Sequence, residues 1–315
     1  MESRQLKVFA RVYEERHLSR AAWQSNISQS AVSFHLKQLE EEYGTQLFVR
    51  EARGMRPTAA AERLYRHVAP ILRSMRALDE DMKRSPDRLA GDIAIGMATS
   101  AMKAIGRDLI SSVLQKYPEV RLSIMEAIPG STLLEVLKTN TELAVVFNPF
   151  DYPELKKKPI LKEEMVCVGR PDIIGATDEA IEVDELLALP LISFRRLGKL
   201  IDDSLLLKQI DARAGIRINS MQAIGDAMLD GHGCMLGSRL YFREHIEAGR
   251  LHFRPIAGPP VERTLYICEL AERPATSITE TMSDLLVNLL ASKVRDGAWR
   301  ATLLVNCETA DHARD

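Results

Sequence analysis

The sequence predicts a multidomain chain in which an all-α N-terminal part precedes a larger α/β part. Up to about residue 90, apolar residues recur at the three- and four-residue spacing of helices. From Asp92 onward, apolar runs typical of strands alternate with helical patterns, which favours parallel α/β units. The length of 315 residues allows two or three domains.

Two helices are expected at the start of the chain. The spacing of Leu6, Phe9 and Val12 predicts a helix over residues 3–15. Ser19 is expected to cap a short second helix, whose alanines let another helix approach closely.

A third helix, capped by Ser28 and extending to Leu39, has two chemically different faces. Val32, Leu36 and Leu39 form an apolar stripe that can pack on a core, while the other side carries small polar side chains suited to base edges in the major groove. Alone, this stretch also fits an ordinary amphipathic surface helix. Together with the preceding short helix and turn, it has the spacing of a helix-turn-helix. Gln29, Ser30 and Ser33 are the expected base-contacting residues, and Lys37 is expected at a phosphate.

A short basic segment follows this helix. The β-prone run 47–49 is followed by a glycine and three arginines. This pattern is typical of a β-wing that lies along the phosphate backbone, and a solvated charged hairpin is the alternative. The arginines of the expected wing are Arg50, Arg53 and Arg56.

Thr58 is expected to cap a long helix with a coiled-coil seam. Apolar residues at alternating spacings of four and three favour pairing with a second copy, which makes the protein a dimer. Pro70 is expected to kink this helix, and residues 85–91 end it as a hinge. The seam residues are Leu64, Val68, Ile71, Met75, Leu78 and Met82.

The C-terminal two thirds of the chain alternate strands with helices. The expected strands are 93–97, 120–124, 143–147, 165–168, 191–194, 217–219, 234–236 and 265–270. The expected helices are 105–114, 133–137, 199–214, 222–230, 240–248 and 278–292. Residues 296–315 are polar and weakly patterned, so we expect a partly ordered tail.

Charge is distributed unevenly along the chain. Residues 1–90 contain 16 Lys and Arg against 12 Asp and Glu, and the remainder contains 26 against 32, so a +4 segment precedes a −6 body. A basic N-terminal end favours nucleic acid binding confined to that end. The sequence has no apolar run of the ~20 residues that span a membrane and no signal-peptide core, so a cytoplasmic protein is expected.

The sequence offers no motif for catalysis, a metal or a cofactor, and none of these is expected. The run 233–237 lacks nucleophile-elbow spacing, no glycine-rich phosphate loop follows a strand, and the seven histidines do not cluster. An α/β enzyme is therefore disfavoured, and the basic wing disfavours an exported solute-binding protein. Cys167, Cys234, Cys268 and Cys307 lie far apart and are expected to be buried thiols, with redox sensing as the alternative.

An N-terminal run of residues fits a known signature in order and spacing. It comprises Leu6, Phe9, Ser19, Ala21, Ala22, Ser28, Gln29, Ser33, Leu36, Leu39, Glu40, Gly44, Leu47, Phe48, Arg50 and Thr58. With this run the chain resembles the LysR-type transcriptional regulators across residues 3–295. Ser30 stands where the family usually has proline, Phe34 where arginine or another polar residue is common, and Pro57 where leucine is usual. Phe34 could contact a thymine methyl group or pack on the dimer's linker helix, and packing is our expectation.

The resemblance implies the domain organisation. A winged helix-turn-helix domain (1–58) and a dimerisation linker with a hinge (59–90) precede an effector domain that resembles periplasmic binding proteins. Its two subdomains, 91–161 with 267–295 and 162–266, are joined by two crossing strands, and a tail spans 296–315. The resemblance also implies a small-molecule effector in the cleft, a dimer of dimers on promoter DNA, and RNA polymerase as a partner.

Residues at helix starts and strand ends are expected to line the effector cleft. Free N–H groups at helix N-termini attract carboxylates, so a small organic anion is the expected effector. Ordinary helix caps are the alternative for the serines and threonines. The expected effector-binding residues are Thr99, Ser100, Pro129, Gly130, Ser131, Asn148, Ser193, Phe194, Arg195 and Met221.

Overall fold

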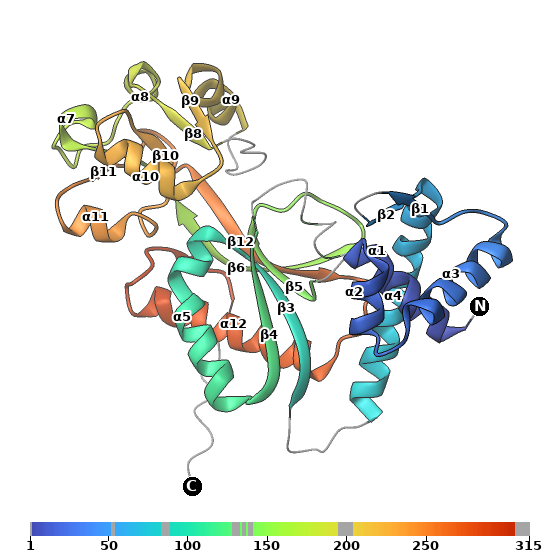
Figure 1. The fold of residues 1–315 in the computed structure, drawn as a ribbon. Coiled ribbons are helices and arrows are strands. Elements are labelled where there is room, and N and C mark those ends of the chain that lie inside the picture. Colours follow the sequence, from blue (N-terminus) through green and yellow to red (C-terminus); the bar gives the residue numbers. More distant parts are fainter. Residues whose placement is uncertain are drawn as a thin grey trace, which may run out of the picture. The chain divides into compact units, whose positions relative to one another are not determined.

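The computed structural model describes residues 2–51, 54–82, 89–127, 133, 137, 141–194 and 204–305. The chain divides into two compact units, residues 1–84 and 85–315. The first unit consists of three short helices, a two-stranded hairpin and a long helix around a core that includes Phe9, Val32 and Leu39. Its elements are α1 (Ser3–Glu15), α2 (Leu18–Gln24), α3 (Gln29–Tyr43), β1 (Phe48–Glu51), β2 (Gly54–Pro57) and α4 (Ala59–Met82) (Figure 1).

The start of α2 differs from the sequence expectation. The helix begins at Leu18, after the extended residue His17, so Ser19 lies inside the helix and does not cap it. The Ser19 hydroxyl instead donates a hydrogen bond to Oε1 of Gln29, at 3.1 Å. Ser19 therefore links α2 to the first residue of α3.

Helix α4 uses its first half to complete the core of its own unit. Thr58 Oγ1 accepts a hydrogen bond from the Ala61 backbone N–H at 3.3 Å, and the helix continues through Pro70. Val68 is only 1% exposed, so its expected place in the dimer seam is wrong. The 3.6-residue period of the helix turns Val68 toward α1 together with Tyr65, and both belong to the core.

The remaining seam residues are more accessible. Ile71 and Leu78 are exposed, and Leu64 and Met75 are half-buried. The side chain of Met82 lies outside the described residues. A dimer through this face stays a prediction.

The second unit contains a six-stranded sheet in the order β13-β6-β12-β5-β3-β4. Strand β3 is parallel to β4 and β5, as the expected parallel α/β units require. Strand β12 is antiparallel to β5 and β6, so that expectation is wrong for β12 and β6. Helices α5 and α12 lie side by side on the sheet, and their apolar residues share its core (Figure 1). The elements are β3 (Ala90–Ala98), α5 (Thr99–Lys116), β4 (Glu119–Ala127), β5 (Leu143–Phe147), β6 (Leu155–Glu164), β12 (Glu262–Leu270), α12 (Ser277–Arg295) and β13 (Thr302–Leu303).

A smaller subdomain is inserted between β6 and β12. Its three-stranded sheet has the order β10-β7-β11, and a bridge between Leu191 and Cys234 connects it to the parallel pair β8-β9. Figure 1 shows β6 and β12 running side by side out of the larger sheet toward this subdomain. Its elements are β7 (Val166–Gly169), α7 (Pro171–Ile174), α8 (Val183–Ala188), β8 (Ile192–Phe194), α9 (Ser204–Arg213), β9 (Ile216–Ile218), α10 (Met221–Leu229), β10 (Met235–Gly237), α11 (Arg243–Glu247) and β11 (His252–Arg254).

Two segments are more ordered than their sequence suggests. Strand β6 contains four lysines and Pro159, and it pairs with β12 across an irregularity in register next to that proline. Among the described residues after 295, Trp299 is fully buried against the larger sheet and β13 adds to its edge, so the expected tail does not begin at 296. Because β6 ends at 164 and β12 begins at 262, the larger sheet extends a few residues past the expected subdomain boundaries.

Candidate nucleic-acid interface and effector site

Helix α3 presents most of the expected DNA-contacting residues on one outward face. Ser28 Oγ accepts a hydrogen bond from the Ala31 N–H at 3.2 Å and caps the helix. Val32, Leu36 and Leu39 are buried on the inner side. Gln29, Ser30, Phe34 and Lys37 are exposed, whereas Ser33 is half-buried at the edge of the face.

Local hydrogen bonds orient several side chains of this face. Gln29 Oε1 is held by the Ser19 hydroxyl, which leaves the two amide N–H donors of Gln29 for other partners. The hydroxyls of Ser28 and Ser30 lie 2.8 Å apart. Lys37 forms an exposed ion pair with Glu41, with Nζ 3.5 Å from Oε1. An exposed pair of this kind is weak enough for a phosphate to displace it.

The hairpin β1-β2 forms the expected wing beside α3. Arg50 and Arg56 are exposed on its strands, and Arg56 Nε donates to the Glu51 carboxylate. Arg53 lies outside the described residues. The two described arginines place positive charge on the hairpin, as a phosphate-contacting wing requires.

Two contacts that the sequence does not reveal fix the wing. Glu40 Oε1 accepts hydrogen bonds from the backbone N–H groups of Leu47, at 2.7 Å, and Phe48, at 3.2 Å. Gly54 has φ +137°, and a Cβ there would lie 2.4 Å from the Arg16 carbonyl oxygen, so only glycine fits this close approach. The one sequence feature that points to a role for Glu40 is its place in the N-terminal signature.

The first predicted effector residues lie at the start of α5. Thr99 and Ser100 are the first two residues of this helix. Ser100 is buried, and its Oγ accepts a hydrogen bond from Nη2 of Arg263 on β12, at 2.9 Å. Ser100 is therefore already bonded to a residue that the sequence reasoning missed.

Arg263 belongs to a buried ion pair on the two crossing strands. It pairs with Glu163 of β6, and Nε lies 2.6 Å from Glu163 Oε1. The other carboxylate oxygen accepts from Trp299 Nε1, at 2.6 Å, and from the Ser238 hydroxyl, at 3.2 Å. The guanidinium also stacks 3.6 Å from the ring centroid of Phe147. We call Glu163, Arg263, Ser100, Ser238 and Trp299 the junction network.

Asn148 lies next to the junction network at the end of β5. Its φ of +41° is in the left-handed region, and its backbone N–H donates to the Thr264 carbonyl at 3.0 Å. Its Oδ1 accepts from the Thr264 N–H at 2.8 Å. Ser100 and Asn148 are thus held by the adjacent residues Arg263 and Thr264.

The other predicted effector residues that the structure describes lie in the smaller subdomain. Ser193 and Phe194 are buried on β8, and Met221 is the first residue of α10. Phe194 and Met221 share one apolar cluster. Pro129, Gly130, Ser131 and Arg195 lie outside the described residues, so a single site formed by both groups stays a prediction.

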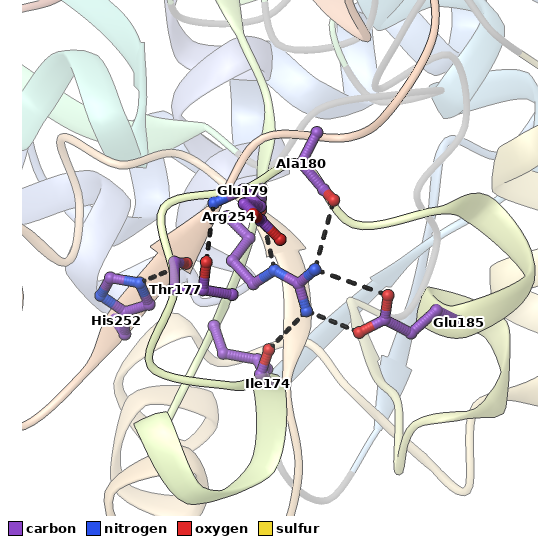
Figure 2. Close-up of polar contacts among 7 residues, drawn as sticks. All are labelled: Ile174, Thr177, Glu179, Ala180, Glu185, His252 and Arg254. Atoms are coloured by element: carbon purple, nitrogen blue, oxygen red, sulfur yellow. Dashed lines mark hydrogen bonds and ion pairs between the residues drawn. The ribbon is translucent and has the colours of Figure 1, made fainter.

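The smaller subdomain has a second buried arginine, Arg254 of β11, with a different set of partners (Figure 2). Its Nε donates to the Glu179 carbonyl at 2.9 Å, and Nη1 donates to the Ile174 carbonyl at 2.8 Å. Nη2 donates to the Ala180 carbonyl at 3.2 Å, and the Glu185 carboxylate accepts from both terminal nitrogens. This arginine therefore fixes the segment between α7 and α8 and has no donor left for a ligand.

The described cysteines are buried thiols. Cys167 and Cys234 hydrogen bond to each other, and this bond, followed by burial, raises the pKa of Cys167. Burial raises the pKa of Cys268 to about 12. A buried thiol that resists ionisation is a poor nucleophile, which favours the inert interpretation for Cys167 and Cys268. Cys234 is buried as well. Cys307 lies outside the described residues.

Neither a metal site nor a membrane-spanning helix is present among the described residues. There, no group of three His, Cys, Asp or Glu side chains is placed to hold a metal ion. Nor does any described helix combine the length and apolar character that a bilayer crossing needs.

Relatives and solved structures resemble the chain over most of its length. The chain is 25% identical to the HTH-type transcriptional regulator BbuR of Bordetella bronchiseptica, covering 93% of this chain and 91% of that protein. It is also 25% identical to the nitrogen assimilation regulatory protein nac of Klebsiella aerogenes, with coverages of 92% and 96%.

Two solved structures show the same fold. A full-length OxyR variant from Pseudomonas aeruginosa has a TM-score of 0.72 and 21% identity, covering 92% of this chain and 97% of that one. Full-length CbnR in complex with its target DNA has a TM-score of 0.61 and 17% identity, with coverages of 91% and 99%.

Two family models match the two units. Residues 3–62 match the bacterial regulatory helix-turn-helix protein of the lysR family, and residues 86–291 match the LysR substrate binding domain. The chain therefore belongs to the LysR family of transcriptional regulators, with an N-terminal helix-turn-helix and a C-terminal effector-binding domain.

Proposed function

We propose that the chain binds operator DNA through α3 and the wing, and that a small organic anion in the C-terminal domain controls this binding. The observation that carries the proposal is the outward face of α3, where amide, hydroxyl and ammonium groups stand opposite the buried stripe. Gln29, Ser30 and Ser33 contact bases, and Lys37, Arg50, Arg53 and Arg56 contact phosphates. Through this contact the protein acts in the cytoplasm on transcription by RNA polymerase, and it has no catalytic role.

Fluorescence anisotropy on selected operator DNA and on random DNA tests this division of roles. Gln29→Ala is expected to weaken operator binding and leave random DNA unchanged, whereas Arg50→Ala should weaken both alike. Arg50→Ala should also reduce the slope of log affinity against log salt by about 0.9 for each DNA-bound chain. Equal losses on both DNAs for Gln29→Ala would contradict base contact.

The effector proposal rests on the geometry at the start of α5. Ser100 Oγ accepts a hydrogen bond from Arg263, so its own proton is left to donate to an acceptor. The first turn of the 18-residue helix also offers unpaired N–H groups. Glu163 balances the charge of Arg263, so the serine and the helix, rather than the guanidinium, bind the anion.

A thermal-shift panel of mono- and dicarboxylates and aromatic acids tests this site. A carboxylate that raises the melting temperature of the wild type should lose most of that shift in Ser100→Ala. Ser292→Ala, which removes an exposed hydrogen bond to Asp296 at the end of α12, is the control and should keep the shift. A shift that survives Ser100→Ala unchanged would place the anion elsewhere.

We further propose a homotetramer built through two surfaces. The exposed residues Ile71 and Leu78 on α4 offer the first. Ile110 and Leu114, one turn apart on α5, and Met125 on the edge strand β4 offer a second exposed apolar surface. Leu114→Glu should yield a dimer in analytical ultracentrifugation, and Leu78→Glu should disrupt the pairing of linker helices.

A further inference from the structure

Phe34 is an exposed aromatic side chain in the middle of the outward face of α3. A rotation of 100° per residue places it almost opposite the buried residue Val32, between Ser30 and Lys37. The side chain is 58% exposed. Its ring meets the His35 ring edge-on, with centroids 5.9 Å apart. An apolar group therefore occupies the centre of the face that the proposed function turns toward DNA.

The exposure of Phe34 excludes packing on the linker helix of its own chain. The side chains of α4 that face the core, such as Tyr65 and Val68, are buried against the other helices of the unit. Phe34 is not among the residues of that core. Packing on the linker helix of a partner chain is the remaining alternative, and it predicts an effect on dimerisation.

The chemistry of the major groove distinguishes one base from the others for an apolar side chain. Guanine, adenine and cytosine present hydrogen-bonding groups there, and a phenyl ring that desolvates them offers nothing in return. Thymine also presents its 5-methyl group, which a phenylalanine can cover favourably. A ring at this position therefore selects for a methyl group rather than for a donor or an acceptor.

We propose that Phe34 contacts the 5-methyl group of a thymine in each operator half-site and selects that base through its methyl group. The proposal rests on the proposed function, in which α3 enters the major groove. It adds a specificity-determining residue that acts by apolar contact beside the polar base contacts of Gln29 and Ser30.

Deoxyuridine substitution tests the proposal because it removes the methyl group and keeps base pairing. An operator is first selected from random duplex DNA with the wild-type protein. Each thymine of one half-site is then replaced in turn by deoxyuridine, and dissociation constants are measured for the wild type, Phe34→Ala and Trp23→Ala. Trp23, 81% exposed on α2, is the matched aromatic control.

The expected result is one thymine at which uracil weakens wild-type binding about fourfold, the effect of burying one methyl group. The ratio of the dissociation constant with uracil to that with thymine should fall to about one in Phe34→Ala. It should stay near four in Trp23→Ala, whatever Trp23 contributes to affinity. A half-site in which no uracil penalty depends on Phe34 overturns the proposal. So does a Phe34→Ala protein that dissociates to monomers in ultracentrifugation, since Phe34 then packs on a partner. A wild type that selects no sequence overturns the proposed function instead.

Discussion

The two buried arginines in the described part of the C-terminal unit are only nine residues apart in the chain, yet they are held in opposite ways. Arg254 donates to three backbone carbonyls and to Glu185, whose own side chain is half exposed. Arg263 donates to side chains, Ser100 and Glu163, and Glu163 in turn accepts from Trp299 and Ser238 (junction network).

This difference indicates different roles for the two arginines. Backbone carbonyls cannot change rotamer, so Arg254 fixes one conformation of the segment that it binds (Figure 2). Side-chain partners can exchange, and the junction network joins the start of α5, both crossing strands and the C-terminal segment. The junction network is therefore suited to respond to a ligand at Ser100, whereas Arg254 and its partners are suited to hold the smaller subdomain rigid.

The largest expected effect is the destabilisation of the effector domain by Arg254→Ala. One buried and two partly buried carbonyls lose their donor, together with the half-exposed carboxylate of Glu185, so we expect the free energy of unfolding to fall by about 3–5 kcal/mol. Urea unfolding followed by circular dichroism measures it. Arg121→Ala, which breaks an exposed pair with Asp92, is the control and should change stability by about 1 kcal/mol or less. A similar loss of unfolding free energy in both variants would contradict the structural role of Arg254.

Replacing both members of each ion pair by uncharged residues distinguishes the roles of the two arginines. Glu163→Gln alone leaves the buried charge of Arg263 unpaired and should cost about 3–5 kcal/mol. Adding Arg263→Met removes that charge, so the double variant should be more stable than Glu163→Gln.

The same treatment of the other pair should not restore stability. In Glu185→Gln with Arg254→Met the three carbonyls lack donors, so the double variant should be less stable than Glu185→Gln. Recovery of stability in both double variants would show that the two clusters do not differ.

Trp299→Phe is a smaller perturbation of the junction network. The change keeps an aromatic ring but removes the donor to Glu163 Oε2, which retains Ser238 as a partner. We expect a loss of about 1–3 kcal/mol in urea unfolding. In Glu163→Gln the effect of Trp299→Phe should shrink, because the bond is then no longer charge-assisted. Equal effects in both backgrounds would separate Trp299 from the network.

The DNA-binding unit could be predicted from the sequence in some detail because its features are local. The apolar stripe, cap and polar face of α3 all lie within 16 consecutive residues, and α1 has the predicted bounds Ser3–Glu15. The misplaced cap at Ser19 and the misassigned Val68 have one cause: each contacts another helix of the same unit, and helical spacing does not show that.

The junction network could not be predicted, for a physical reason. Arg263 is 100 residues from Glu163 and 163 residues from Ser100 in the chain. In addition, a charged residue within a strand pattern is normally predicted to face solvent. Trp299 is buried, although it follows a helix in a polar segment whose sequence has no apolar periodicity that would predict burial. The pairing of β6 with β12 places Arg263 directly opposite Glu163, and this long-range register cannot be read from local spacing.

The buried thiols provide the smallest expected effect. Burial holds the pKa of Cys268, on β12, at about 12, above its ordinary value of 9.0. A raised folded-state pKa favours the neutral thiol, so its stabilising contribution is complete below pH 9 and is lost as the pH rises toward 12. Relative to Cys268→Ala, the wild type should lose about 1.4 kcal/mol of unfolding free energy between pH 8 and pH 10.

The same burial predicts the chemical behaviour of the thiols. In the native protein at pH 8, Cys167, Cys234 and Cys268 should not react with a disulfide reagent, and all three should react in urea. Hydrogen peroxide should then leave operator binding unchanged in a Cys307→Ser protein. Native reactivity at Cys167 or Cys234, with a change in DNA binding, would instead show that the smaller subdomain opens and would favour redox sensing.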